Sequence, residues 1–315
     1  MAGRGGRGGA LGQGCGTAAA RRGGLVQGVR RILVTGASGQ VGGAVALARP
    51  DVVALGREAL DFDRPSTIAA ALEAHAPGVV INAAAYTAVD RAEGDAAAAM
   101  RANRDGPAEL ARCCAERDIA LIHVSTDYVF DGNKGAPYVE TDLPAPTGVY
   151  GASKRAGEEA VLATGAKAVI VRTAWVFSAT GRNFVRTLLA AATRNPTLRV
   201  VADQHGCPTA APDLAQVLLG IADRLEGGWR DGYRGIVHAA GGGASTWHEL
   251  AVALFEERAK RGEARPVIEP IPTAAWPTPV RRPPDSRLDQ ALLLARFGLA
   301  MPPWRDGLAR VVEQL

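Results

Sequence analysis

Tyr150 and Lys154 have the residue types and the spacing of a proton-donating site. They stand at positions i and i+4 of a helix-like segment, YGASKRAGEEA, and such positions share one helix face with a rise of about 6 Å. A free tyrosine has a pKa of about 10 and is a poor acid near neutrality, but a neighbouring ammonium stabilises the tyrosinate and lowers that pKa. The sequence therefore predicts that Lys154 tunes Tyr150 as a general acid.

A glycine-rich turn, TGASGQVG, has the composition of a phosphate-binding turn. Gly36, Gly39 and Gly42 come directly after an apolar strand and at the start of a helical run, which is the context of a dinucleotide-binding turn. Small residues let the backbone approach a diphosphate, and the helix N-terminus adds partial positive charge. The same glycines would also suit a turn that only connects strand to helix. Together with the Tyr–Lys pair, they favour a hydride-transfer site.

The end of the second predicted strand bears on the choice between NADPH and NADH. About 20 residues after the first glycine of such a turn, NAD-binding proteins usually place an acid that binds the ribose 2′-hydroxyl. Here this position is Gly56, followed by Arg57. An arginine without a nearby acid suits a 2′-phosphate, so NADPH is favoured and NADH remains the alternative. Arg57 can equally be a solvated surface charge.

Two further stretches are candidates for the cofactor site. After the third predicted strand, Ala83, Ala84 and Ala85 offer small side chains where a cofactor would pass, although tight packing of helix on sheet explains them as well. Asp61 and Phe62 could lie against the adenine, but an Asp in the sequence DFDRP is also a helix-capping residue. Both alternatives stay open at this point.

The residues that position these groups alternate between short strands and longer helices. The predicted strands are 31–35, 51–55, 78–82, 119–125 and 167–173, and the predicted helices are near 40–48, 66–75, 95–117 and 150–164. Nearly continuous apolar strands in a βαβ rhythm are typical of a parallel sheet covered on both faces. The sequence thus predicts an α/β fold with a Rossmann-type doubly wound parallel sheet.

Beyond residue 173 the rhythm loosens. We expect helices near 183–194, 212–226 and 246–260 and strands at 198–201 and 235–240, whereas seven prolines between 266 and 284 exclude a long helix and indicate an extended segment. The predicted division is a dinucleotide-binding domain over 30–173, its sheet completed by strands from 195–240. Residues 174–315 would mainly form a smaller substrate-binding lobe.

Composition and charge exclude several classes of protein. The net charge of +4 equals the four arginines of the Gly/Arg-rich residues 1–29, which hold no acid and which we expect to be a disordered tail. We therefore expect no nucleic-acid partner. No apolar run approaches the ~20 residues of a membrane-spanning helix. The four cysteines lack metal-type spacing, and neighbouring Cys113 and Cys114 cannot easily bridge each other, so a reducing, cytoplasmic compartment is expected.

Several blocks together resemble the extended short-chain dehydrogenase/reductases, and within them the dTDP-4-dehydrorhamnose reductases. They run in order from about residue 31 to the C-terminus: GASGQVG, VINAAAYTAVDRAE, STDYVFDG, VYGASKRAGE, RTAWVFS, ADQHGCPT, STWHE and PTPVRRPPDSRL. The resemblance implies reduction of the 4-keto group of a dTDP-linked 6-deoxyhexulose to dTDP-L-rhamnose, with NAD(P)H as the hydride donor. The order of the blocks is far more specific than any single motif.

The resemblance also assigns roles to individual residues. It implies that Tyr150 is the proton donor, that Lys154 binds the ribose and tunes the tyrosine, and that Thr126 hydrogen-bonds the reacting ketone. The matching phosphate-turn residues are Gly39, Gln40 and Val41, and the matching sugar- or nucleotide-contacting residues are Thr87, Asp127 and Trp175. Trp175 could instead be a core residue, and Thr126 could cap a loop.

Other functions on the same fold remain alternatives. A nucleotide-sugar dehydratase commonly has an Asp-Glu pair after the Thr, whereas here Tyr128 follows Thr126-Asp127. A 4-epimerase would keep its cofactor bound, and a non-catalytic protein resembling the regulatory beta subunit of methionine adenosyltransferase would act as a binding partner. The five histidines show no metal-site spacing. The family is sometimes associated with Mg²⁺ at a dimer contact, which makes a homodimer an expected assembly, but no ligands for Mg²⁺ are identifiable.

Overall fold

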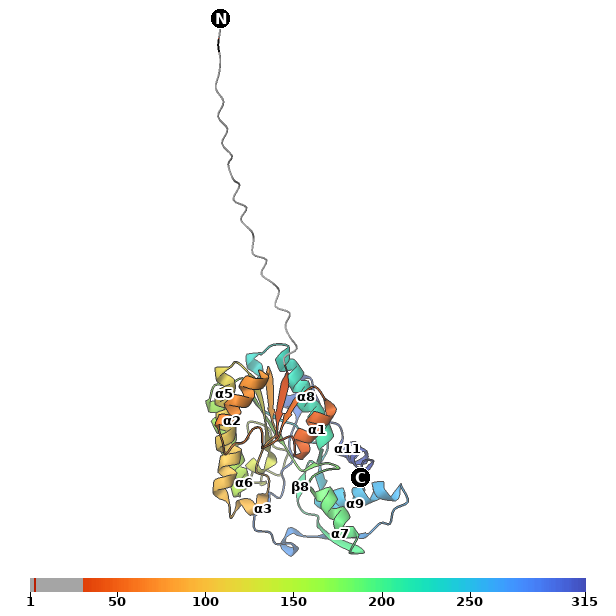
Figure 1. Cartoon of the computed structure of the whole chain (residues 1–315). Helices are drawn as coiled ribbons and strands as arrows, with labels where there is room; N and C mark the ends of the chain where they lie inside the picture. Colours follow the sequence, from red (N-terminus) through yellow and green to blue (C-terminus); the bar gives the residue numbers. More distant parts are fainter. Residues whose placement is uncertain (1–2, 4–30) are drawn as a thin grey trace.

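A six-stranded parallel sheet lies at the centre of the computed structural model, which describes Gly3 and residues 31–315 (Figure 1). The rest of the expected tail, residues 1–29, lies outside the described residues. The strands, in their order across the sheet, are β10 (Gly235–His238), β5 (Ala168–Thr173), β4 (Ala120–Thr126), β3 (Val79–Asn82), β1 (Ile32–Thr35) and β2 (Val53–Leu55). The predicted parallel α/β sheet is confirmed.

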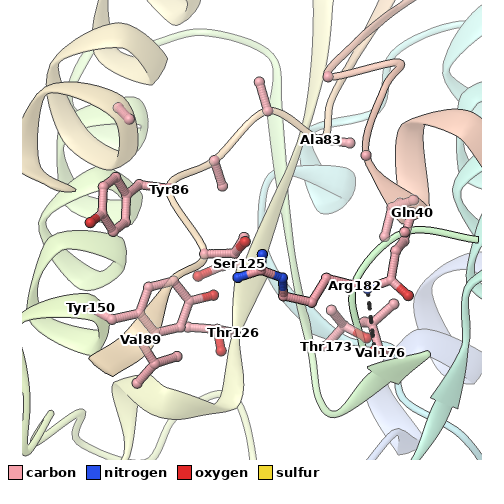
Figure 2. Close-up of a pocket in the computed structure, with 18 of the residues that line it drawn as sticks. Gln40, Ala83, Tyr86, Val89, Ser125, Thr126, Tyr150, Thr173, Val176 and Arg182 are labelled. Atoms are coloured by element: carbon pink, nitrogen blue, oxygen red, sulfur yellow. Dashed lines mark hydrogen bonds between the residues drawn. The ribbon is translucent and has the colours of Figure 1, made fainter. Parts of the chain in front are cut away.

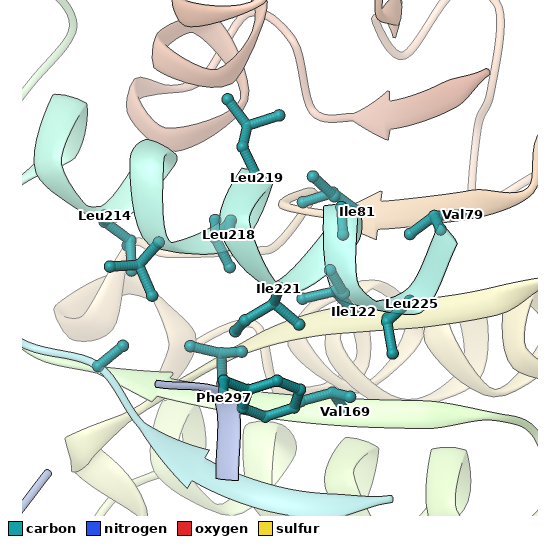
Figure 3. Close-up of a cluster of buried hydrophobic side chains, with 14 of the residues drawn as sticks. Val79, Ile81, Ile122, Val169, Leu214, Leu218, Leu219, Ile221, Leu225 and Phe297 are labelled. Atoms are coloured by element: carbon teal, nitrogen blue, oxygen red, sulfur yellow. The ribbon is translucent and has the colours of Figure 1, made fainter. Parts of the chain in front are cut away.

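Helices cover both faces of this sheet because successive strand residues point to opposite sides. In β1, Ile32 and Val34 pack into one buried cluster and Leu33 into another. The first cluster includes α8 (Ala211–Glu226), whose leucines and Ile221 lie over the central strands (Figure 3). Helix α1 (Gln40–Ala48) lies beside α8 on this face, whereas α2 (Ser66–His75), α5 (Gly106–Glu116) and α6 (Val149–Ala163) cover the other face.

The strand order creates a switch point between β1 and β3. The chain leaves β1 toward β2 on one side, then returns through α2 to β3 on the other side. Open parallel sheets bind ligands outside the carboxyl ends of the strands at such a point. Gly36 follows β1 directly, and Ala83 follows β3 directly. The topology therefore brings two of the predicted cofactor segments together.

A second lobe has its own apolar core. Its helices are α7 (Phe184–Ala192), α9 (Trp247–Ala259) and α11 (Trp304–Val312), and they pack on a parallel pair formed by β7 (Thr197–Val201) and β12 (Val267–Ile271). Of the two strands expected to complete the main sheet, β10 does so at the edge beside β5, but β7 does not. It pairs with β12 because the extended, proline-rich segment supplies that strand.

The described part of the chain holds several shorter elements. They are β6 (Val176–Phe177) with β9 (Thr209–Ala210), β8 (His205–Gly206) with β11 (Ser245–Thr246), α3 (Val89–Ala92), α4 (Ala96–Met100) and the 3₁₀ turns η2 (Asp127–Val129), η3 (Asp231–Tyr233) and η4 (Thr273–Ala275). Helices α10 (Ala291–Phe297) and α11 were not predicted from the sequence. No helix among residues 31–315 combines the length and the apolar character that crossing a bilayer requires.

Candidate functional site

A pocket of about 990 Å³ opens at the switch point, near the upper end of the volumes usual for ligand sites. Most of the predicted site residues line it: Gly36, Gly39, Gln40, Val41, Arg57, Asp61, Phe62, Ala83, Ala84, Ala85, Thr87, Thr126, Asp127, Tyr150 and Trp175. Gly42 and Lys154 are not part of the lining; both are buried behind it. Figure 2 shows Tyr150 and Thr126 together at one end of the view and Gln40 at the other.

The glycine turn is crowded in a way that fits a dinucleotide. Gly36 has a φ of 70°, and a Cβ there would lie 2.7 Å from the backbone nitrogen of Ala84. A Cβ on Gly42 would lie 2.3 Å from the carbonyl oxygen of Gly36. Helix α1 begins at Gln40 with no side chain capping its first N–H groups. The turn lines the pocket and leaves backbone donors at the start of α1 uncapped, so it suits a diphosphate.

The buried Thr126 and Asp127 and the half-buried Tyr150 form the inner end of the pocket. Burial raises the pKa of Tyr150 to about 12; its hydrogen bond with Thr126 acts in the opposite direction, and the charge of Asp127 adds to the rise. Burial also raises the pKa of Asp127 to about 6, against hydrogen bonds from Ser286 (2.6 Å) and Thr126 (3.1 Å). Tyr150 therefore holds its proton at neutral pH, and Asp127 is mostly ionised there.

Lys154 is buried, and its ammonium is directed at the strand below the pocket. Its Nζ donates to the carbonyl oxygen of Val124 over 2.7 Å and lies 3.4 Å from His123 Nε2. Burial lowers the pKa of Lys154 to about 8. The prediction that Lys154 lowers the pKa of Tyr150 is wrong for this geometry, because the ammonium is bonded elsewhere and burial dominates the phenol.

A buried chain of hydrogen bonds continues from Lys154 across three strands. His123 Nδ1 is joined to Asn82 Nδ2 over 2.9 Å, and Asn82 Oδ1 accepts from Thr35 Oγ1 over 2.6 Å. Burial, and then the charge of Lys154, hold the pKa of His123 well below its usual value, so the imidazole is neutral. This chain fixes the strand floor on which Lys154 rests.

A π-helical turn, η1 (Arg101–Asp105), holds α6 in place. Within it, Asn103 accepts from the backbone N–H of Tyr86 (2.9 Å) and donates to Ser153 Oγ (2.9 Å). A Cβ on Gly157 would lie 1.9 Å from the carbonyl oxygen of Asn103, so only glycine permits this approach. The helix that carries Tyr150 is thus tied to the loop after β3. Nothing in the sequence pattern predicted the role of Asn103.

The outer end of the pocket is exposed and carries mutually paired charges. Arg57 pairs with Asp63 and, over 3.3 Å, with Asp61, whereas Arg101 reaches Asp63 over 3.1 Å. The sequence prediction treated Arg57 as free of a nearby acid, and this is wrong because the turn after β2 folds both carboxylates back onto it. Asp61 accepts from the backbone N–H of Asp63, inside its own turn, and does not cap α2.

Trp175 takes an uncommon backbone conformation on the far wall of the pocket. Its φ is 48°, and its ring stacks on Trp247 with the centroids 3.5 Å apart and an interplanar angle of 6°. A Cβ on Gly206 would lie 2.3 Å from the Trp175 ring. The ring is therefore packed on two sides and still lines the pocket, so the expected packing role is observed, and contact with the sugar or nucleotide stays a prediction. Trp247, in the block STWHE, was not predicted as a pocket residue.

Metal ligands and thiols were also considered from the sequence. Over residues 31–315, no group of three or more His, Cys, Asp or Glu side chains is arranged to hold a metal ion. Cys113, Cys114 and Cys207 are buried free thiols. Burial is the first cause of the raised pKa of each, so they lack the lowered pKa typical of reactive cysteines.

Comparisons with known proteins agree with this geometry. Residues 30–315 match the family model described as RmlD substrate binding domain. A dTDP-4-dehydrorhamnose reductase of Sinorhizobium fredii is 42% identical over 288 residues, which cover 90% of this chain and 97% of that protein. A probable dTDP-4,6-dihydroxy-2-methyloxan-3-one 4-ketoreductase of Streptomyces antibioticus is 43% identical, covering 88% of this chain and 93% of that protein.

A solved structure extends the likeness to the whole fold. The crystal structure of a dTDP-4-dehydrorhamnose reductase from Bacillus anthracis, in complex with NADP, has a TM-score of 0.83 at 32% identity and covers 91% of this chain and 99% of that one. The multiple-block resemblance to the dTDP-4-dehydrorhamnose reductases is thereby confirmed. The chain belongs to the RmlD substrate binding domain family.

Proposed function

We propose that this protein is an oxidoreductase that reduces the 4-keto group of dTDP-4-dehydro-6-deoxy-L-mannose to dTDP-L-rhamnose, with NADPH as the preferred cofactor. The family and the two dTDP-sugar ketoreductases among its relatives support the reaction. The observation that carries the proposal is the half-buried Tyr150, hydrogen-bonded with Thr126 at the inner end of a pocket that begins at a glycine turn. The product is used for rhamnose-containing polysaccharides.

The inner end supplies the proton for the reduction. When bound, the reduced nicotinamide supplies a hydride to the ketone carbon. Tyr150 Oη donates its proton to the ketone oxygen, on which negative charge develops, and Thr126 Oγ1, whose hydroxyl donates to Asp127 in this structure, would turn to donate a hydrogen bond to that same oxygen. A pKa of about 12 keeps the phenol protonated before the reaction. It does not prevent the transfer, because an alkoxide is a much stronger base than a phenolate.

Lys154 places a buried ammonium one helical turn from Tyr150. Its Nζ is held on a floor formed by Val124 and His123. With a pKa of about 8 it is mostly charged at neutral pH. The same ammonium is assigned to the ribose of the cofactor. It is the buried positive charge beneath the site.

The sugar would lie at the inner end of the pocket. Asp127 is mostly ionised at neutral pH and has the acceptor capacity to bind sugar hydroxyls, while Thr87 adds a hydroxyl of its own. The Trp175 face is apolar and suits the carbon side of a pyranose. Gly36, Gly39, Gln40, Val41 and Gly42 would hold the cofactor diphosphate, with Ala83, Ala84 and Ala85 beside it.

The cofactor site accepts both nicotinamide dinucleotides, with NADPH preferred. The Bacillus anthracis reductase was solved with NADP, which supports this preference. Arg57, Asp61 and Phe62 line the outer end, where the adenosine would lie. A homodimer and a cytoplasmic location are further parts of the proposal; the buried free thiols agree with a reducing compartment. Light scattering of the purified protein measures the assembly.

The direct test mixes purified protein with NADPH and the dTDP-linked 4-keto sugar while the absorbance of the reduced nicotinamide is followed. We expect consumption of one NADPH for each sugar, with dTDP-L-rhamnose identified by NMR. The UDP-linked analogue and the sugar turned over by the Streptomyces antibioticus relative serve as specificity controls. Tightly bound NAD with interconversion of C4 epimers and no net oxidation would instead indicate an epimerase. Absence of any turnover, with co-purification of a synthetase, would indicate a regulatory subunit.

A further inference from the structure

The loop before α7 is tied to the glycine turn through one side chain. Ser178 Oγ and Asn183 Nδ2 both donate to Gln40 Oε1, over 2.8 and 2.9 Å. A Cβ on Gly181 would lie 3.2 Å from the Gln40 side chain. Gln40 is the first residue of α1. The 178–183 loop, although it belongs to the second lobe, is therefore fixed beside the N-terminus of the helix that follows the phosphate turn.

Arg182 projects from this loop into the main pocket, as Figure 2 shows. Within the part of the chain that the structure describes, its guanidinium has no hydrogen-bond or ion-pair partner. The other two arginines that line the pocket are both engaged, because Arg57 pairs with Asp61 and Asp63, and Arg101 pairs with Asp63. Among the cations of the described lining, Arg182 is thus the one available to a ligand.

The pocket lining is rich in carboxylates, so an anionic ligand would need a cation such as Arg182 to offset their negative charge. Four carboxylates line the pocket, those of Asp61, Asp63, Asp95 and Asp127. A diphosphate brings further negative charge, and the N-terminus of α1 offers only a partial positive charge against it. A guanidinium presents a planar fork of donors that matches phosphate oxygens. Arg182 has this chemistry, and its loop is fixed on Gln40 beside the glycine turn.

We propose that Arg182 binds the diphosphate of the dinucleotide cofactor, closing over it from the second lobe while the glycine turn holds it from the first. This deepens the proposed function and rests on it for the identity of the ligand. The anchoring of the 178–183 loop on Gln40 favours the cofactor diphosphate over that of the nucleotide sugar. Both ligands carry the same group, so the experiment separates them.

The test measures binding in the intact protein, without turnover. Dissociation constants for NADPH and NADH are obtained by fluorescence, and those for dTDP and thymidine by calorimetry. The variants are Arg182→Ala, Arg182→Lys and the control Arg194→Ala, which removes the same charge from the turn after α7, in a hollow that Arg182 also borders but outside the main pocket. Wild-type turnover of the dTDP-linked sugar is measured separately, so that failure of the proposed reaction is distinguishable from failure of this inference.

We expect Arg182→Ala to weaken the binding of NADPH and of NADH by the same factor, about tenfold at low salt, because the diphosphate is common to both. Arg182→Lys should recover part of the lost affinity, and Arg194→Ala should leave the affinity for both cofactors unchanged. A loss confined to dTDP and absent for thymidine would support a diphosphate contact with the nucleotide sugar. A loss for NADPH alone would point to the 2′-phosphate and overturn the proposal. Unchanged affinity for all four ligands would overturn it as well.

Discussion

The two ends of the main pocket hold charged groups in opposite environments. Beneath the inner end, Arg172 and Glu158 form an ion pair over 2.6 Å with both side chains almost inaccessible, and Glu158 also accepts from Ser125 Oγ over 2.6 Å. At the outer end, Arg57 is 74% exposed and pairs with the exposed Asp63 and with Asp61, which is largely buried. The same residue types therefore occur in two settings that differ mainly in their access to water.

The difference shows where electrostatic interactions control structure and chemistry. In a buried environment a charge without its partner is very costly, so Glu158, Arg172 and Ser125 fix the geometry of the strands beneath Tyr150. At the surface, water and salt screen each pair, and the arginines can exchange partners with little cost. Catalytic geometry therefore belongs to the inner end, and adaptable ligand contacts belong to the outer end.

The largest expected effect comes from breaking the buried pair. Glu158→Leu leaves Arg172 buried without its carboxylate, and we expect the free energy of unfolding to fall by about 3–5 kcal/mol. Asp63→Ala, which removes the acid shared by Arg57 and Arg101, should cost under about 1 kcal/mol. Urea denaturation of both variants measures the contrast. Equal losses would mean that the two ends do not differ in the way described.

Lys154→Met comes next, because it removes the buried ammonium while keeping much of the side-chain volume. We expect kcat/KM to fall by about 10²-fold and the affinity for NADPH to fall as well. In the wild type, activity should decline as pH rises through about 8, since Lys154 loses its charge there. The variant should lack this decline. A retained decline would assign it to another group.

Asp127→Asn tests the carboxylate with the raised pKa. The charged form dominates above its pKa of about 6, so wild-type kcat/KM for the sugar should fall as pH drops below that value. The variant should lose about tenfold above pH 6, typical of one charge-assisted hydrogen bond, and show little pH dependence between 5 and 7. If the acid side of the profile survives in the variant, Asp127 is not the titrating group.

The smallest expected effect is that of Arg57→Ala. Any 2′-phosphate must compete with Asp61 and Asp63 for this exposed guanidinium, so we expect the KM for NADPH to rise only about threefold. The KM for NADH should stay unchanged. An equal rise in the KM for both cofactors would show that Arg57 does not contact the 2′-phosphate. A rise above tenfold for NADPH would show that the 2′-phosphate displaces both carboxylates from Arg57.

Elements that depend on local sequence patterns were predicted, whereas pairings between distant segments were not. Most strands and helices up to residue 173 followed from apolar runs and glycine signals, because local patterns determine them, and β1, α1 and α6 lie where they were expected, whereas α3 was not predicted. The partners of β7 did not follow, since its pairing with β12 joins segments about 70 residues apart. Helices α10 and α11 were not predicted, because the prolines before them favour an extended chain.

Within the site, residue identity was more predictable than electrostatics. The glycine turn, Tyr150 and Thr126 were found from spacing, whereas the direction of the Tyr150 pKa shift was not, because it depends on burial and on where Lys154 Nζ bonds. Arg182 and Asn103 were missed since their positions depend on contacts between distant segments. A helical sequence pattern predicts on which face of the helix a residue lies, but it does not predict how exposed the side chain is to solvent.

The central claim is that Tyr150 donates the proton to the reduced ketone. A single-turnover measurement with Tyr150→Phe, saturating NADPH and the dTDP-linked 4-keto sugar tests it most directly, because the substitution removes only the hydroxyl. We predict that the rate of nicotinamide oxidation falls by about 10²–10⁴-fold, while the dissociation constant of NADPH, measured on the same sample, stays within twofold of the wild type. A rate near that of the wild type would show that another group donates the proton and would contradict this account.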